Sequence, residues 1–193
     1  MINDIKPLHV ELGSGEKIPR GRLRSAEDIL YIDARPLLGV DLVYDLSLGI
    51  PLEDNSVFTI FSCHFLEHLS YDSVIGHILP DAFRILRPGG RFTTQMPDFD
   101  RIVKVWNNRC DCVDYETWQV DPLCIHCGGK AVIGPQRLRE YLFGGQDHAF
   151  DLHRYVWGFK DFKDILLKTG FLSVENKDPL DSPIDMYVTA IKG

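Results

Sequence analysis

The sequence lacks the marks of a membrane-spanning, exported or nucleic-acid-binding chain. None of its apolar runs approaches the ~20 residues that cross a bilayer, and the N-terminal MINDIKPLHVEL has no basic segment followed by an apolar core. Basic residues are outnumbered, with 21 Lys and Arg against 28 Asp and Glu, and a formal net charge of −7 disfavours binding to phosphate backbones. We therefore predict a cytoplasmic protein, with reduced thiols, that binds neither membrane nor nucleic acid.

Repeats, low-complexity tracts and linkers are also absent, so the 193 residues are predicted to form one domain. Apolar runs of strand length alternate with segments of helical spacing. Strands are predicted at 8–12, 29–33, 41–44, 56–63, 91–96, 171–175 and 186–191. Helices are predicted at 98–107, 135–143 and 160–169, and at 70–86 with a kink or break at Pro80. The alternation predicts an α/β fold with a doubly wound, mostly parallel sheet of seven strands.

Residues 108–133 interrupt this alternation and are predicted to be a small cysteine-rich insertion in the domain. The segment carries Cys110, Cys112, Cys124 and Cys127, and the second pair is followed by Gly-Gly-Lys, as in a zinc-ribbon knuckle. Four thiolates would make a closed tetrahedral site, so the predicted metal is a structural zinc ion. Disulfides explain the pattern less well in a reducing compartment.

A strand running into a tight turn, HVELGSGEK, lacks the third glycine of a dinucleotide-binding turn. Gly13 and Gly15 are one residue apart, but the third position after Gly15 is Ile18. An acid is nevertheless present, since Asp33 ends the second predicted strand 20 residues after Gly13. The acid favours a nucleoside ligand, with or without a phosphate at the turn, and ordinary turn glycines are the alternative.

Four segments in this order resemble the class I S-adenosylmethionine-dependent methyltransferases, and among them short presumptive members. They are ELGSG, YIDARP, DLVYDLSLGIPLEDNSVFTIFSCHFLEHL and AFRILRPGGRF, which together fall within residues 8–98. The resemblance implies a Rossmann-like methyltransferase fold and S-adenosylmethionine as cofactor. Implied cofactor contacts are Glu11, Gly13 and Gly15 at the methionine end, Asp33 at the ribose, Asp45 and Leu46 at the adenine, and Cys63 and His64 near the amine and methyl.

Methyl transfer to a poor nucleophile such as a hydroxyl also needs a base, and histidine titrates near neutral pH. His64, His148 and His153 are the candidates; the last two lie in GGQDHAFDLHRY, which could cap the pocket or be a surface loop. For His68 a structural role is favoured. The sequence thus predicts methyl transfer to a small-molecule or saccharide acceptor. A non-catalytic methyltransferase-like scaffold with a zinc module for partner binding is the alternative.

Overall fold

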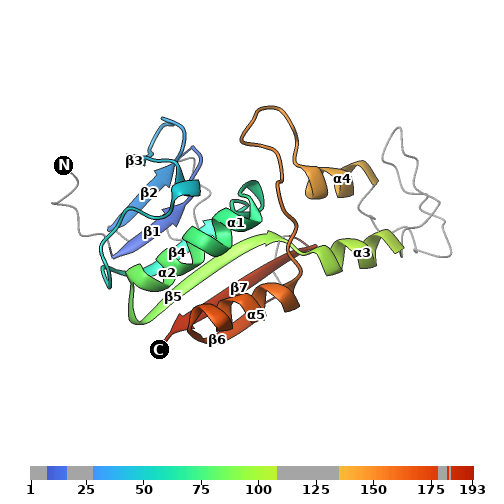
Figure 1. The fold of residues 1–193 in the computed structure, drawn as a ribbon. Helices are drawn as coiled ribbons and strands as arrows, with labels where there is room; N and C mark the ends of the chain where they lie inside the picture. The colour runs from blue at the N-terminus through green and yellow to red at the C-terminus, as the bar shows by residue number, and fades with distance from the viewer. Residues whose placement is uncertain (1–7, 17–27, 108–134, 178–181, 183) are drawn as a thin grey trace.

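The computed structural model describes residues 8–16, 28–107, 135–177, 182 and 184–193 (Figure 1). The predicted zinc ligands Cys110, Cys112, Cys124 and Cys127 lie outside these ranges and stay a prediction. In the described part of the chain, no helix is both long enough and apolar enough to span a bilayer.

Seven strands form one sheet in the order β3-β2-β1-β4-β5-β7-β6. Their bounds are β1 His9–Leu12, β2 Ile29–Asp33, β3 Leu42–Val43, β4 Val57–Cys63, β5 Leu86–Pro97, β6 Phe171–Lys177 and β7 Asp185–Lys192. All seven were predicted, with β5 longer and β3 shorter than expected. The β5 difference arises because Leu86 already pairs with Val57 of β4, and the ladder resumes at Arg91 after an irregularity at RPGG, where Gly89 has φ 76°.

The sheet is mixed. The pairs β2–β3, β1–β2, β1–β4 and β4–β5 are parallel, whereas β7 runs antiparallel to both of its neighbours, β5 and β6. The first residue of β7, Asp185, lies opposite Pro97 at the end of β5. The start of β7 therefore lies at the same edge of the sheet as the ends of the parallel strands.

The helix predicted at 70–86 keeps helical backbone throughout but changes its hydrogen-bond pattern ahead of the proline. It begins as α1 Tyr71–Ser73, passes through the π-helical turn η3 Val74–Ile78, and continues as α2 Leu79–Ile85 with Pro80 in its first turn. The N–H of Leu79, just before the proline, still bonds to the carbonyl of Val74, so the proline does not end the helix. Ser70 caps the start of α1 by accepting the N–H of Ser73.

The remaining helices are two short 3₁₀ turns and three α-helices. They are η1 Leu46–Leu48, η2 Leu66–His68, α3 Phe99–Asn107, α4 Pro135–Phe143 and α5 Phe159–Thr169. The α5 helix ends at Gly170, which has φ 117° and sends its N–H back to the last turn. A left-handed residue at this position is what ends many helices, so the predicted glycine stop is confirmed.

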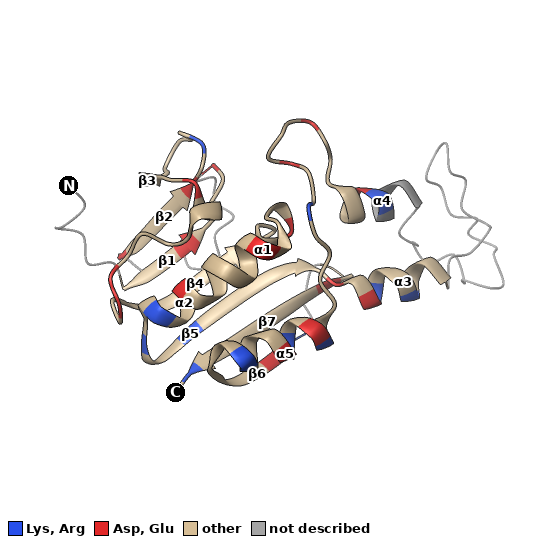
Figure 2. Ribbon diagram, in the orientation of Figure 1, with Lys and Arg blue, Asp and Glu red and all other residues tan. Residues whose placement is uncertain are grey.

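The main core lies between the sheet and the layer formed by α2 and α5, which contact each other on one face of the sheet (Figure 1). Buried side chains of this core include Val10, Ile60, Leu79, Phe162 and Leu166. A second helical layer on the other face, which a doubly wound sheet would have, is not seen among the described residues. Figure 2 shows Lys and Arg spread over α2, α3, α4 and α5 and interleaved with acidic residues.

Candidate functional site

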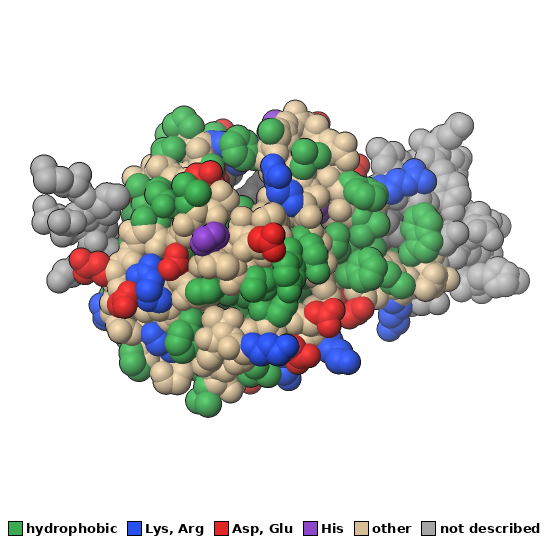
Figure 3. Space-filling model, in the orientation of Figure 1, with side chains coloured by type: hydrophobic (Ala, Val, Ile, Leu, Met, Phe, Trp, Pro, Cys, Tyr) green, Lys and Arg blue, Asp and Glu red, His purple; other side chains and the backbone are tan. Residues whose placement is uncertain are grey.

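A cavity of about 500 Å³ opens at the edge of the sheet where the parallel strands end. Its walls come from the turns after β1, β2, β3 and β4, from the start of α1, and from the segment 148–154 between α4 and α5. Figure 3 shows a hollow in this face between the region of β3 and that segment. In open α/β sheets this edge is where ligands bind, and the volume suits a ligand of small-molecule size.

The glycine turn after β1 is shaped by one neighbouring side chain. Gly13 has φ 63°, and a Cβ there would lie 2.2 Å from the Phe65 ring. Gly15 has φ 61°, and a Cβ there would meet no heavy atom of the described residues within 4 Å. Gly13 therefore makes room for Phe65, whereas at Gly15 the positive φ, and not a close neighbour among the described residues, favours glycine.

Asp33, at the end of β2, is 5% exposed and lies beside this turn. Its Oδ2 accepts the N–H of Gly15 at 2.9 Å, and its Oδ1 accepts the N–H of Arg35 at 2.9 Å and the Arg35 Nε–H at 3.2 Å. A carboxylate has about four acceptor positions. Three are used, so Oδ2 can accept one more hydrogen bond without displacing a protein donor.

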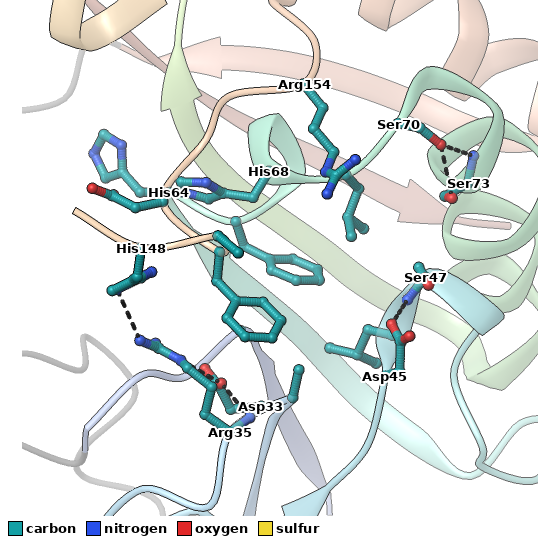
Figure 4. Close-up of a pocket in the computed structure, with 18 residues that line it drawn as sticks. Asp33, Arg35, Asp45, Ser47, His64, His68, Ser70, Ser73, His148 and Arg154 are labelled. Carbon is teal, nitrogen blue, oxygen red and sulfur yellow. Dashed lines mark hydrogen bonds and ion pairs between the residues drawn. The ribbon is translucent and has the colours of Figure 1, made fainter. Parts of the chain in front are cut away.

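Arg35 also links the two sides of the cavity. Its Nη1 lies 3.4 Å from Nε2 of His148, which comes from the segment between α4 and α5 (dashed line in Figure 4). His148 is exposed and forms part of the cavity wall. This contact therefore joins the turn after β2 to the segment between α4 and α5.

The start of η1 forms another side of the cavity. Asp45 caps this turn, with its Oδ1 accepting the N–H of Ser47 at 2.9 Å, and the neighbouring Leu46 is 3% exposed and supplies an apolar wall. Figure 4 shows Asp45 and Ser47 on one side, Asp33 and Arg35 on a second, and His68 and Arg154 on a third.

His64 follows β4 and is held between two buried carboxylates. Its Nδ1–H donates to Oε1 of Glu67 at 3.1 Å, and its Nε2–H donates to Oδ2 of Asp185 at 3.2 Å. Both carboxylate side chains are 2% exposed, whereas that of His64 is 39% exposed. The backbone of His64 has φ 50°, a left-handed conformation that turns the chain away from the strand.

These contacts fix the charge of His64. Burial alone lowers the pKa of its ring, but the hydrogen bonds to Asp185 and Glu67 outweigh burial and raise the pKa to about 11. Burial raises the pKa of Asp185, but the hydrogen bond from His64, the charge of His64 and the hydrogen bonds from Gln95 and Ser182 together outweigh burial, so its pKa lies below the ordinary value. His64 is therefore an imidazolium ion at neutral pH.

Two further histidines, His68 and His153, contact each other through their rings. The rings of His68, from η2, and His153 stand edge to face with centroids 4.8 Å apart. Burial lowers the pKa of His68, and the neighbouring His153 lowers it further against the opposing effect of Glu67. His68 lines the cavity, and His153 does not.

The structure brings together most of the residues predicted from sequence, but not all. The described walls include Gly13, Asp33, Asp45, Leu46, His64 and His148. Glu11, Gly15, Cys63 and His153 are close in the chain to wall residues but are not wall residues themselves. Sequence reasoning missed the other wall residues, among them Arg35, Phe65 and Arg154, and it favoured a structural role for His68, which also lines the cavity. For Phe65 and His68 the signal was present, since both lie in the turn that follows the central strand.

No family model and no curated protein matches the chain. Solved structures do. The candidate methyltransferase in the complex with the Trm112 methyltransferase activator of Haloferax volcanii is 16% identical, with a TM-score of 0.59 over 95% of this chain and 81% of that one. A candidate S-adenosylmethionine-dependent methyltransferase from Listeria monocytogenes is 17% identical, with a TM-score of 0.55 over 98% and 93%. An S-adenosylmethionine-dependent methyltransferase from Mesorhizobium loti is 20% identical, with a TM-score of 0.55 over 95% and 90%.

This chain has the fold of the class I methyltransferases. The similarity extends over nearly all of this chain and over more than four fifths of each of these three structures. Sequence identities this low show a shared fold only, so evidence on the reaction of this chain comes from the residues of its cavity.

Proposed function

We propose that the chain binds S-adenosylmethionine in the cavity at the strand ends and transfers its methyl group to an acceptor. The observation that carries this proposal is the placing of Gly13, Asp33 and Asp45 around one cavity of about 500 Å³. They stand after β1, β2 and β3, which are neighbours in the sheet. One ligand can therefore contact all three turns.

The residues present suit the nucleoside part of this cofactor. The remaining acceptor position on Oδ2 of Asp33 can take one ribose hydroxyl, while a second bond, to Oδ1, requires the Arg35 side chain to move. Leu46 offers an apolar surface for the adenine ring, and Asp45 a carboxylate for its polar edge. Gly13, which lines the cavity in the turn after β1, is the contact we propose for the amino-acid end.

The bound cofactor supplies an electrophilic methyl group on a sulfonium, and the chain has to orient the acceptor and exclude water. His64 is suited to an electrostatic and orienting role, because both ring nitrogens are engaged by carboxylates and it keeps its proton at neutral pH. His148 also lines the cavity, and its Nε2 could accept a proton from an acceptor once it is released from the Arg35 Nη1–H that it accepts in the structure. His153 would act only through His68.

The acceptor we propose is a small molecule or a saccharide. Acidic residues predominate in the whole chain, and the described basic residues are spread rather than clustered (Figure 2), which suits such acceptors better than a nucleic acid. The structural zinc ion at Cys110, Cys112, Cys124 and Cys127 also remains a proposal, supported by the cysteine spacing. Zinc analysis of the purified protein checks it, and a value near zero would contradict it.

We expect S-adenosylhomocysteine to stabilise the protein. At a ligand concentration about 100 times Kd, binding to the folded state adds about 2.7 kcal/mol. For a chain of this size the melting temperature should rise by roughly 5 to 10 °C in a thermal-shift measurement. NAD is the matched control and should give no shift, because the turn after β1 lacks the third glycine of a pyrophosphate site.

The two ligands separate the candidate functions. A shift with NAD and none with S-adenosylhomocysteine would overturn the methyltransferase proposal in favour of a dinucleotide enzyme. The absence of both shifts, in protein that melts cooperatively, would favour the non-catalytic scaffold.

A further inference from the structure

Three metal-ligating side chains converge at the side of the cavity formed by His68. They are Glu67 and His68, adjacent in η2, and His153, from the segment between α4 and α5. One carboxylate oxygen and one ring nitrogen from each histidine all lie within 4.8 Å of one another. None of these three residues is among the predicted cofactor contacts or the predicted cysteine ligands of zinc.

Backbone hydrogen bonds hold the two segments together independently of the side chains. The carbonyl oxygen of Glu67 accepts the N–H of Arg154 at 2.7 Å and that of Tyr155 at 3.3 Å. The N–H of His153 donates to the carbonyl of Phe143 at the end of α4, at 3.2 Å. The cluster is therefore part of the fold and not a chance meeting of two mobile side chains.

Each histidine ring has its proton placed by a backbone carbonyl. Nδ1 of His68 lies 3.2 Å from the oxygen of Leu152, and Nδ1 of His153 lies 2.8 Å from the oxygen of Tyr141. A carbonyl can only accept, so Nδ1 carries the hydrogen and Nε2 keeps its lone pair in the neutral ring. This outer hydrogen bond is the one that metal-binding histidines almost always make.

The burial of the Glu67 carboxylate is a second observation, separate from the spacing of the three side chains, that points to a bound cation. Its side chain is 2% exposed, and Oε1 accepts the Nδ1–H of His64. Oε2 is buried and has no hydrogen-bond partner among the described residues. A buried carboxylate oxygen without a partner is costly, and a cation bound at Oε2 would remove that cost.

We propose that Glu67, His68 and His153 bind one divalent first-row metal ion. Two imidazoles and one carboxylate suit Mn²⁺, Fe²⁺ or Zn²⁺ and leave coordination positions open. Ligand atoms ~2.1 Å from a metal lie roughly 3.0 to 3.4 Å apart, so small side-chain rotations are needed to close the observed spacing. Because His68 lines the cavity, an open position would face it.

The ligand expected at the open position is an oxygen atom of a small molecule, such as a hydroxyl or a carboxylate. A bound cation lowers the pKa of a hydroxyl that coordinates it. That role rests on the proposed methyl transfer, in which the hydroxyl would belong to the acceptor. The binding of the metal itself does not rest on it.

Titration of the full chain with Mn²⁺, after removal of bound metals with a chelator, tests the site. Mn²⁺ prefers oxygen and nitrogen ligands, so it avoids the thiolates of the cysteine-rich segment. Electron paramagnetic resonance of free Mn²⁺ should show one tightly bound equivalent per chain. His68→Gln and His153→Gln should each weaken binding at least tenfold, whereas His77→Gln, an exposed histidine on η3, should not change it.

A second readout does not depend on the folding of any variant. In the wild-type protein, one equivalent of Mn²⁺ should broaden the amide NMR signals of residues 66–69 and 152–155 before others. The absence of saturable binding, binding that persists in both histidine variants, or broadening centred elsewhere would overturn the proposal. S-adenosylhomocysteine added to the metal-free protein reports on the cofactor site separately, so the two proposals can fail independently.

Discussion

Replacing His64 by Asn is expected to lower the free energy of unfolding by about 2 to 3 kcal/mol. The variant leaves the buried carboxylates of Glu67 and Asp185 without their shared cation. Removing one member of a fully buried ion pair costs about 3 to 5 kcal/mol. We expect less here because the His64 side chain is 39% exposed and water partly screens the charges.

Asparagine is chosen because it tolerates the positive φ of His64, so the loss reports on charge and not on backbone strain. Equilibrium unfolding in urea at neutral pH measures the change. His77→Asn, at an exposed position on η3, is the matched control and should change stability by less than about 0.5 kcal/mol. A His64 variant as stable as this control would show that the imidazolium does not hold the two carboxylates together.

The second large effect is expected at Asp33, where substitution by Asn should weaken binding of S-adenosylhomocysteine by about 10- to 100-fold. A hydrogen bond to a charged group contributes about 1.5 to 3 kcal/mol, which corresponds to that range. The amide can still accept from Gly15 or Arg35 through its single oxygen, so the turn after β1 keeps part of its support.

Isothermal titration calorimetry measures this change directly. Asp161→Asn removes an exposed carboxylate on α5 that is not part of the cavity walls, and it should leave Kd within twofold. If Asp33→Asn binds as tightly as wild type while Asp161→Asn does too, the ribose does not bind at the end of β2. The nucleoside contact would then have to be sought at Asp45.

The residues around the cavity were predictable where they follow parallel strands. Asp33, Asp45 and His64 each come after an apolar run of strand length, and the ends of parallel strands meet at one edge. Asp185 was not predicted as a partner of His64. It reaches the same edge because β7 is antiparallel, so its first residue lies where the other strands end.

The meeting of His68 with His153 could not be read from the sequence either. The residues are far apart in the chain, and they are joined by backbone hydrogen bonds from Glu67 to Arg154 and Tyr155, which no side-chain pattern reveals. The irregularity in the 70–86 helix was predictable, because the effect of proline on a helix is local, but its form was not: the chain passes through the π-helical turn η3 and stays helical. Local rules thus predicted the strands and the position of this irregular helix, whereas contacts between distant loops required the structure.

A crystal structure of the protein with S-adenosylhomocysteine tests the central claim most directly. We predict that the ribose lies against Asp33, the adenine beside Leu46 and Asp45, and the amino-acid end beside the turn at Gly13. The sulfur should then lie on the side of the cavity that holds His64 and His68. A ligand bound outside this cavity, or a cavity that stays empty at saturating ligand while the fold is intact, would contradict the account.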